Sequence, residues 1–279
     1  MVDEVGRDRN GLPLTEPAST YRSDVRSAYD VAASGWAAGA GVIYRALADA
    51  LVALLPSHGP GTVLDLCAGT GAASAALARR GLAVIAADVS AQMLRLSRGE
   101  RPPAVTADAV ALPFRGGAFA SVVVAFGLNH APEPVAFLRE TRRVVRAGGI
   151  VVASTFAGGW PHPAKAAVDD VLEGFGFRPP AWHDRLKREV ELHTGSEQAL
   201  LNIAQRANLR DARASLVEVA PAVTVDQVVG WRFSMASHAG FVAALPQTTR
   251  QQAAIDAAAE VRRRWQPFVV PMLALIARV

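Results

Sequence analysis

Three aspartates stand where short apolar segments of the chain end. Asp65 follows a β-branched, apolar run, Asp88 follows residues 83–87 (AVIAA), and Asp108 follows a third short apolar segment. A carboxylate at the end of a parallel strand can accept hydrogen bonds from the two hydroxyl groups of a ribose. A carboxylate can also bind a cationic amino group. The pattern therefore predicts a site for a ligand that carries hydroxyl and amino groups.

The loop between the first two of these segments reads Cys67-Ala68-Gly69-Thr70-Gly71. A strand, a tight turn and a helix N-terminus leave backbone N–H groups free for a ligand, and glycine lets the backbone come close to it. A dinucleotide-binding loop would have a third glycine at position 74, which is Ser74 here. Asp65 would also repel a pyrophosphate. An NAD-dependent oxidoreductase is therefore a less favoured alternative.

Two histidines are candidates for proton transfer, because a neutral imidazole can accept a proton near pH 7. His130 follows an apolar segment over residues 121–126, in a loop that begins at Phe126. His238 lies in a segment expected to be helical, near Trp231 and Phe233. For each the alternative is a histidine that only supports its own loop or helix.

An alternation of expected strands and helices positions these residues, which predicts a mostly parallel sheet covered on both faces. We expect strands at residues 63–65, 83–87, 105–106, 121–126, 150–156, 214–220 and 272–279. We expect helices at residues 72–79, 90–97, 134–147, 166–175, 182–192, 200–207, 226–241 and 248–265, and two more between residues 21 and 56.

The segment from Asp65 to Gly71 resembles motif I of the class I S-adenosylmethionine-dependent methyltransferases, acid-x-Gly-x-Gly-x-Gly, with Cys67 in place of the first glycine. Residues 108–114 (DAVALPF) resemble the Asp-Ala-x-x-Leu-Pro-Phe segment of the ubiquinone/menaquinone-biosynthesis type of these enzymes. Tyr29-Asp30 matches a recurrent Tyr-Asp pair of small-molecule methyltransferases. The two motif segments and the acid at Asp88 have the family's order and spacing, and this resemblance covers roughly residues 60–156.

The resemblance implies a Rossmann-like α/β fold with a seven-stranded sheet in the order 3-2-1-4-5-7-6. It implies an N-terminal helical cover over residues 20–56 and a methyltransferase domain over residues 57–279. Residues 1–19 contain glycines and prolines and few apolar residues, which predicts a flexible tail. Helical insertions at about 160–195 and 224–265 would form a lid over the site.

The resemblance also assigns the site. S-adenosylmethionine would lie over Asp65, with the ribose on Asp88 and the adenine beside Asp108 and Ala109. Tyr29 would reach the donor's carboxylate end or the acceptor, unless it only packs on the sheet. The full set of expected donor-binding residues is Tyr29, Asp65, Cys67, Ala68, Gly69, Gly71, Asp88, Val89, Met93, Asp108, Ala109 and Phe126.

Composition restricts the function classes. The chain has 279 residues, is 51% hydrophobic and carries a net charge of +4, but its basic residues are dispersed, and Arg262-Arg263-Arg264 is their longest run. We therefore expect no nucleic-acid partner. The polar first residues and the absence of a long apolar run predict a cytoplasmic protein with no membrane partner. The single Cys67 offers no metal cluster, and we expect no metal.

The function expected from the resemblance is methyl transfer to an oxygen or carbon of a small, fairly hydrophobic metabolite, with S-adenosylhomocysteine as co-product. His130 or His238 would be the base, although an acidic acceptor needs none. The alternative is a methyltransferase-fold protein that binds the cofactor but catalyses another reaction, such as a cyclisation, or serves as a scaffold. The candidates for the acceptor pocket are aromatic residues of the expected insertions: Trp160, Phe175, Phe177, Trp182, Trp231 and Phe233.

Overall fold

In the computed structural model, which describes residues 18–36, 39–57, 60–96, 99, 102–158 and 160–279, seven strands form one sheet in the order β3-β2-β1-β4-β5-β7-β6. β7 is antiparallel to β5 and β6, and the other neighbours are parallel. The predicted α/β fold and strand order are confirmed. The strands are β1 (Val63–Leu66), β2 (Val84–Asp88), β3 (Ala104–Thr106), β4 (Phe119–Val124), β5 (Val145–Phe156), β6 (Arg210–Val219) and β7 (Val270–Arg278).

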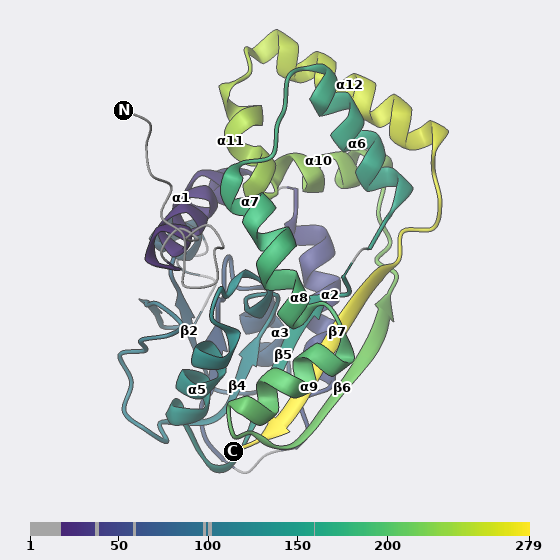
Figure 1. Ribbon diagram of the computed structural model, residues 1–279. Coiled ribbons are helices and arrows are strands. Elements are labelled where there is room, and N and C mark those ends of the chain that lie inside the picture. Colours follow the sequence, from purple (N-terminus) through teal and green to yellow (C-terminus); the bar gives the residue numbers. More distant parts are fainter. Residues whose placement is uncertain (1–17, 37–38, 58–59, 97–98, 100–101, 159) are drawn as a thin grey trace, which may run out of the picture.

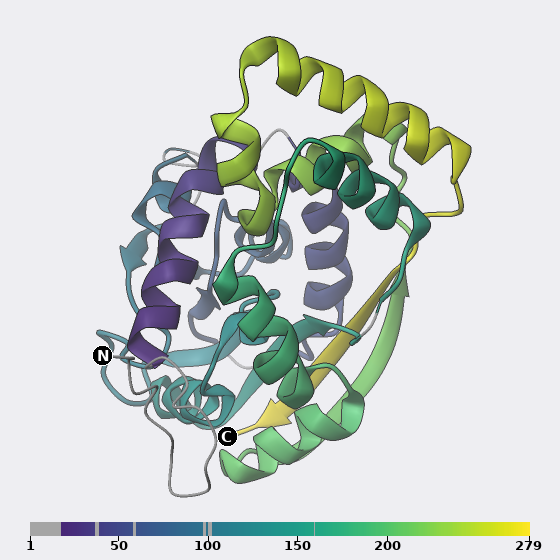
Figure 2. The same ribbon diagram turned by 45° about the horizontal axis from the view of Figure 1, so that its top comes forward.

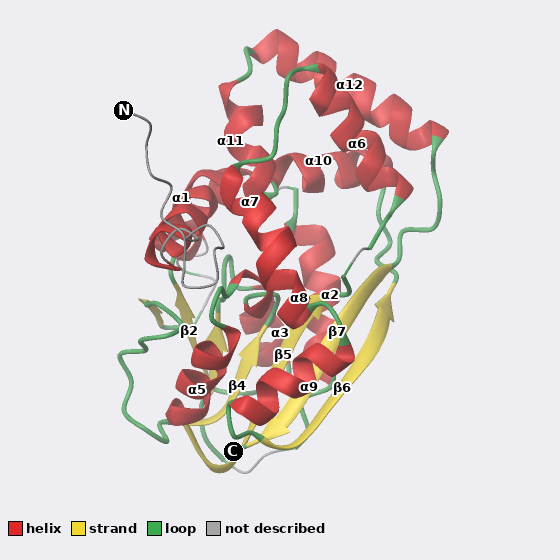
Figure 3. Ribbon diagram, viewed as in Figure 1, coloured by secondary structure: helices red, strands yellow, loops and turns green. Residues whose placement is uncertain are grey.

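Alternate residues of the central strands face two separate hydrophobic cores. Val63 and Val123 belong to one core, whereas Leu64 and Val122 belong to the other. Helices α2 (Gly41–Ala53) and α3 (Ala72–Arg79) pack into the first core, and α5 (Pro134–Val144) and α9 (Glu197–Arg206) pack into the second. Figure 3 shows the helices around the sheet. Because both faces are covered, the central strands are buried and mostly apolar, with Asp65 in β1 and Ser121 in β4 as buried polar residues.

A layer of helices lies over the end of the sheet where the parallel strands finish (Figure 1). This layer contains α6 (Pro163–Gly174), α10 (Val225–Ser234), α11 (Ala236–Ala244) and α12 (Gln247–Arg263). α7 (Ala181–Arg185), a π-helical segment (Leu186–Val190) and α8 (Glu191–Thr194) lead back from it toward the sheet. In the turned view of Figure 2, α1 (Ala18–Trp36) runs beside this layer and contacts α11. The short α4 (Ala91–Leu96) follows β2.

Two elements differ most from the sequence-based expectation. The helix expected at residues 134–147 ends at Val144, and β5 begins at Val145 instead of residue 150. The two glycines expected to end the helix lie within the strand, where Gly149 passes so close to the Ala120 carbonyl that a Cβ would lie 2.5 Å from its oxygen. The pairing of β4 with β5 is irregular at this point.

The second difference is the single helix expected at residues 226–241, which is two helices, α10 and α11. Met235 between them has extended backbone angles (φ −59°, ψ 141°). Ser234, the last residue of α10, accepts a hydrogen bond from the Ala40 backbone N–H at 3.1 Å. The end of α10 is thus bonded to the start of α2, a tertiary contact that has no local sequence pattern.

Residues 1–17 of the expected flexible tail lie outside the described residues, and its last two positions, 18 and 19, belong to α1. No single helix in the described part of the chain is long and apolar enough to cross a membrane. The bent pair Thr20–Trp36 and Gly41–Ala53 passes that test of length and composition only when the two are taken together.

Candidate functional site

The loop after β1 has a left-handed backbone at three positions. Cys67 has φ +60°, Gly69 has φ +55°, and Gly71, the N-cap of α3, has φ +91°. Such angles favour glycine, so Cys67 departs from the family's first glycine at a position where a glycine would be less strained. A Cβ added to Gly69 would meet no atom within 4 Å, so open space lies beside the loop.

That space is a cavity of about 120 Å³, here called the first cavity. Eight of the expected donor-binding residues line it together with His130: Tyr29, Cys67, Ala68, Gly69, Asp88, Val89, Met93 and Phe126. Asp65, Gly71, Asp108 and Ala109 are not among its lining residues. Residues of the N-terminal helices that the sequence did not single out, Val25, Trp36 and Tyr44, complete the wall.

Asp88 lies at the end of β2 and is 8% exposed. Its Oδ2 accepts a hydrogen bond from the Gly69 N–H, and its Oδ1 accepts one from the Ser90 N–H, both at 2.8 Å. Burial raises the pKa of Asp88, while these two backbone donors favour its ionised form. Each oxygen keeps a lone pair for a ligand hydroxyl.

Asp65 is fully buried behind the loop. Its Oδ2 accepts a hydrogen bond from the Ser74 hydroxyl at 2.6 Å, and its Oδ1 has no partner among the described residues. Ser74, which replaces the third glycine of a dinucleotide loop, therefore fixes the acid of motif I. Burial raises the pKa of Asp65 to about 6. An unpartnered, buried carboxylate oxygen is an acceptor for a cationic or N–H group at this site.

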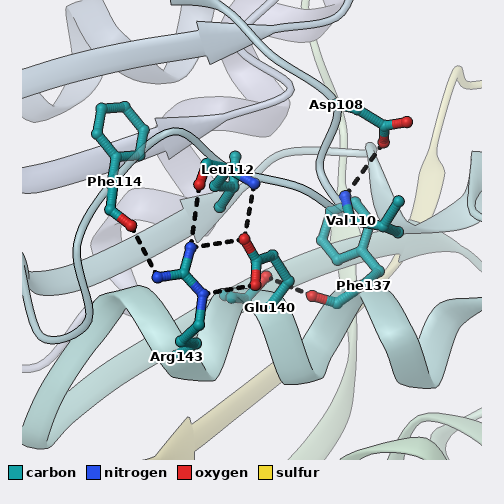
Figure 4. Close-up of polar contacts among 8 residues, drawn as sticks. Asp108, Val110, Leu112, Phe114, Phe137, Glu140 and Arg143 are labelled. Atoms are coloured by element: carbon teal, nitrogen blue, oxygen red, sulfur yellow. Dashed lines mark hydrogen bonds and ion pairs between the residues drawn. The ribbon is translucent and has the colours of Figure 1, made fainter.

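The segment after β3 is held from α5 by two charged side chains (Figure 4). Glu140 accepts a hydrogen bond from the Leu112 N–H at 2.6 Å. Arg143 donates to the Leu112 carbonyl at 3.0 Å and to the Phe114 carbonyl at 2.7 Å, and it is paired with Glu140 at 2.7 Å. Sequence reasoning missed this support. The carboxylate of Asp108 accepts a hydrogen bond from the Val110 N–H within the segment.

Asp108 also faces the N-terminal cover. Its carboxylate lies 3.4 Å from Nε of Arg22 in α1, and the same arginine pairs with Glu133 at 2.6 Å. The structure thus places Asp108 against α1 and not in the wall of the first cavity, so its adenine-binding role stays a prediction.

Tyr29 of the cover reaches the loop after β4. Its hydroxyl oxygen lies 2.8 Å from Nε2 of His130, and the two rings meet edge to face. Burial lowers the pKa of His130 to about 4 and raises the pKa of Tyr29 well above its usual value. Both side chains are therefore neutral near pH 7. Nδ1 of His130 is buried and has no hydrogen-bond partner within the described part of the chain.

A second cavity of about 90 Å³ lies on the other side of this pair. Tyr29, Tyr44 and His130 line both cavities and are here called the shared wall. Of the six aromatic candidates, Trp160, Trp182 and Trp231 line the second cavity, whereas Phe175, Phe177 and Phe233 do not. Sequence reasoning missed further lining residues, among them Lys165, His183, Lys187 and Arg232.

His238, the other histidine candidate, lines neither cavity. It is 1% exposed, its ring stacks on Phe177 with centroids 4.4 Å apart, and its Nε2 lies 3.1 Å from the Asp169 carboxylate. Asp169 in turn binds Arg232 through two hydrogen bonds of 2.6 and 2.7 Å. His238 thus supports Asp169, and Asp169 holds Arg232 in the wall of the second cavity.

The raised pKa of Asp65 predicts a pH-dependent stability. Between an ordinary pKa near 4 and the folded value near 6 the folded protein binds more protons than the unfolded chain, so this group lowers stability as the pH rises through that range. Asp65→Asn removes the effect. We expect the free energy of unfolding of the variant, relative to the unaltered protein, to rise by about 3 kcal/mol between pH 4 and pH 7 in urea denaturation.

The matched control for this measurement is Asp49→Asn, because Asp49 is 55% exposed and pairs with Arg79 on the surface. Its effect should vary little over the same pH range. A constant difference for Asp65→Asn would mean that Asp65 ionises in the folded protein as it does in the unfolded chain.

Comparison with known proteins agrees with this geometry. Residues 64–153 match a family model described as a methyltransferase domain. The demethylmenaquinone methyltransferase of Clavibacter sepedonicus is 40% identical over 144 residues, which are 50% of this chain and 58% of the relative. That of Renibacterium salmoninarum is 37% identical over 142 residues, which are 50% of this chain and 57% of the relative. The chain thus spans about half the length of the curated relatives it matches.

Solved structures share the fold. An Anabaena variabilis protein, assigned as a methyltransferase of an antibiotic biosynthesis pathway, superposes with a TM-score of 0.60 at 18% identity and covers 83% of this chain and 96% of its own. The 4+2 cyclase SpnF gives 0.53 at 18% identity, over 84% and 80% of the two chains. At these identities the likeness concerns the fold alone. Residues 64–153 thus match a methyltransferase domain, and the strand order is that of an α/β fold shared with solved methyltransferase structures.

Proposed function

We propose that this chain transfers the methyl group of S-adenosylmethionine to an oxygen or carbon atom of a small, fairly hydrophobic or aromatic acceptor. The observation that carries the proposal is the pair of adjacent cavities that share Tyr29, Tyr44 and His130. Group transfer between two bound molecules requires that their reacting atoms be aligned and kept from water. Two cavities with one common wall meet that requirement.

The first cavity fits the donor. The open space beside Gly69 allows close approach to the loop, and Asp88, which lines the cavity, offers lone pairs to the ribose hydroxyls. When bound, S-adenosylmethionine supplies a methyl group on a positively charged sulfur. The chain's own task is to hold the donor with that methyl group toward the shared wall.

At the shared wall, His130 would bind the acceptor's reacting group. Its ring is fixed by Tyr29, and its Nδ1 has unused hydrogen-bonding capacity. With a pKa near 4, the imidazole is a neutral but weak base at pH 7, so it best serves an acceptor hydroxyl or carbon acid that is already close to ionisation. His238, which lines neither cavity, has no such role in this proposal.

The second cavity supports an aromatic or apolar acceptor, because three tryptophans line it. The curated relatives act on demethylmenaquinone, as their names state. Most of the second cavity, however, is built by residues after 153, beyond the family model match. The nature of the acceptor is therefore argued from this cavity.

Calorimetric titration with S-adenosylmethionine, S-adenosylhomocysteine and NAD tests the donor site. We expect both adenosyl compounds to bind and NAD not to bind. Asp88→Ala should weaken S-adenosylhomocysteine binding by about 10- to 100-fold, since it removes hydrogen bonds to a charged acceptor. Asp49→Ala, on the exposed side of α2, is the control and should leave the affinity unchanged.

Each result of that titration has a distinct meaning. Unchanged affinity in Asp88→Ala would contradict the placement of the donor. Absence of adenosyl binding in the unaltered protein would contradict the function itself. Adenosyl binding without methyl transfer to any acceptor would support the alternative, in which the chain uses the bound cofactor for a cyclisation or as a scaffold.

His130→Gln tests the shared wall. With an acceptor identified by S-adenosylhomocysteine release from a panel of aromatic hydroxy compounds, we expect kcat to fall about 100-fold. S-adenosylhomocysteine affinity should change little. In the unaltered protein, kcat should show no imidazole inflection near pH 6.5, because burial holds the pKa of His130 near 4. An unchanged kcat in His130→Gln would mean that alignment alone accounts for the reaction.

A further inference from the structure

Lys165 is one of only two lysines in the chain, and it lies in the first turn of α6, facing the second cavity. Its Nζ donates a hydrogen bond to the Trp160 carbonyl at 3.0 Å and lies 4.5 Å from the centre of the Trp160 ring. No carboxylate of the described residues lies within ion-pair distance of it. The first turn of a helix disfavours a cation, so neither the helix nor an ion pair explains this lysine.

A second cation lines the same cavity. Arg232 in α10 is 13% exposed, and its Nε and one terminal nitrogen are bound to Asp169. Asp169 is held from behind by His238. The other terminal nitrogen of the guanidinium remains available for further hydrogen bonds. This buried chain of contacts fixes the direction of Arg232 more firmly than a surface pair would.

The charges around the second cavity do not balance. Lys165, Lys187 and Arg232 line it, whereas Glu191 is the one carboxylate in its wall among the described residues. Lys187 is paired with Glu191, and Asp169 compensates Arg232 from behind. Lys165 thus has no counter-ion among the described residues, and its ammonium group lies over the ring of Trp160. Burying a charge without a partner is costly, which favours a ligand that supplies the partner.

We propose that Lys165, with Arg232 beside it, binds an anionic oxygen of the acceptor, either a carboxylate or an ionised ring hydroxyl, at the part of the second cavity that is not shared with the first. Neither Lys165 nor Arg232 lines the first cavity. The anionic oxygen that they bind is therefore a different atom of the acceptor from the one that receives the methyl group. The acceptor is thereby an aromatic acid, with its ring among Trp160, Trp182 and Trp231. This inference rests on the proposed function and narrows its acceptor class.

A matched pair of probes tests the inference without turnover: 2-naphthoate and 2-naphthamide, which share a ring system and differ in charge. In calorimetric titration at pH 7, we expect the unaltered protein to bind the carboxylate about 10- to 100-fold more tightly than the amide. Lys165→Met should remove most of that preference and leave amide binding unchanged, which also shows that the variant is folded. Arg262→Met is the control, because Arg262 is exposed on α12 and lines neither cavity.

The pH dependence provides a second measurement. Burial and the charges of Arg232 and Lys187 lower the pKa of Lys165 to about 8, against the smaller opposing effects of Asp169 and Glu191. The ammonium form binds the carboxylate, so the preference of the unaltered protein should decline as the pH rises above 8. Lys165→Arg keeps its charge in that range and should keep the preference at pH 9.5. His183 in the same wall has a pKa near 3 and does not change charge there.

Equal affinities of the unaltered protein for the two probes overturn the inference, as does failure of 2-naphthoate to bind. A carboxylate preference that survives in Lys165→Met also overturns it. Failure of the proposed function is distinguishable, because S-adenosylhomocysteine binding is measured at the other cavity in the same titrations.

Discussion

The hydrogen bond between Tyr29 and His130 joins the N-terminal helices to the end of the sheet, and the rest of the site depends on it. Without α1 over the loop after β4, the first cavity would lose Val25, Tyr29 and Trp36 and would open to solvent. The second cavity would lose part of its wall as well. This contact between residues far apart in sequence lies where the two cavities meet. An in-line methyl transfer between two bound molecules needs the donor's methyl group and the acceptor atom to be in direct contact at such a junction.

The residues around this contact are arranged at a cost to stability. Asp65 and Asp88 are buried carboxylates with raised pKa values. Cys67 and Phe126 are non-glycine residues with φ near +60°, one at the end of β1 and the other at the end of β4. Buried carboxylates and non-glycine residues with a left-handed backbone are unfavourable features. Here they lie where these two strands meet the cavities, as is typical of sites that bind ligands. The buried, mostly apolar strands behind the site and their two cores supply the compensating stability.

The sheet order and the donor-binding residues were implied by the family resemblance, and local patterns carry that resemblance: an acid after an apolar strand, glycines in a turn, and a family segment at residues 108–114. The second cavity was mostly missed. Lys165 and Arg232 are far apart in the chain. The local sequence around each of them suggests only a charged side chain exposed to solvent. Only the packing of α6 and α10 brings them to one wall. For the same reason His238 was taken as a candidate base, although its partner Asp169 makes it a support for Arg232.

The most direct test of this account is a crystal structure of the chain grown with S-adenosylhomocysteine. The account predicts the ribose hydroxyls on Asp88 and the sulfur toward the shared wall of Tyr29, Tyr44 and His130, with the second cavity open beyond it. A ligand bound with its sulfur away from that wall would contradict the account, even if S-adenosylhomocysteine occupied the first cavity.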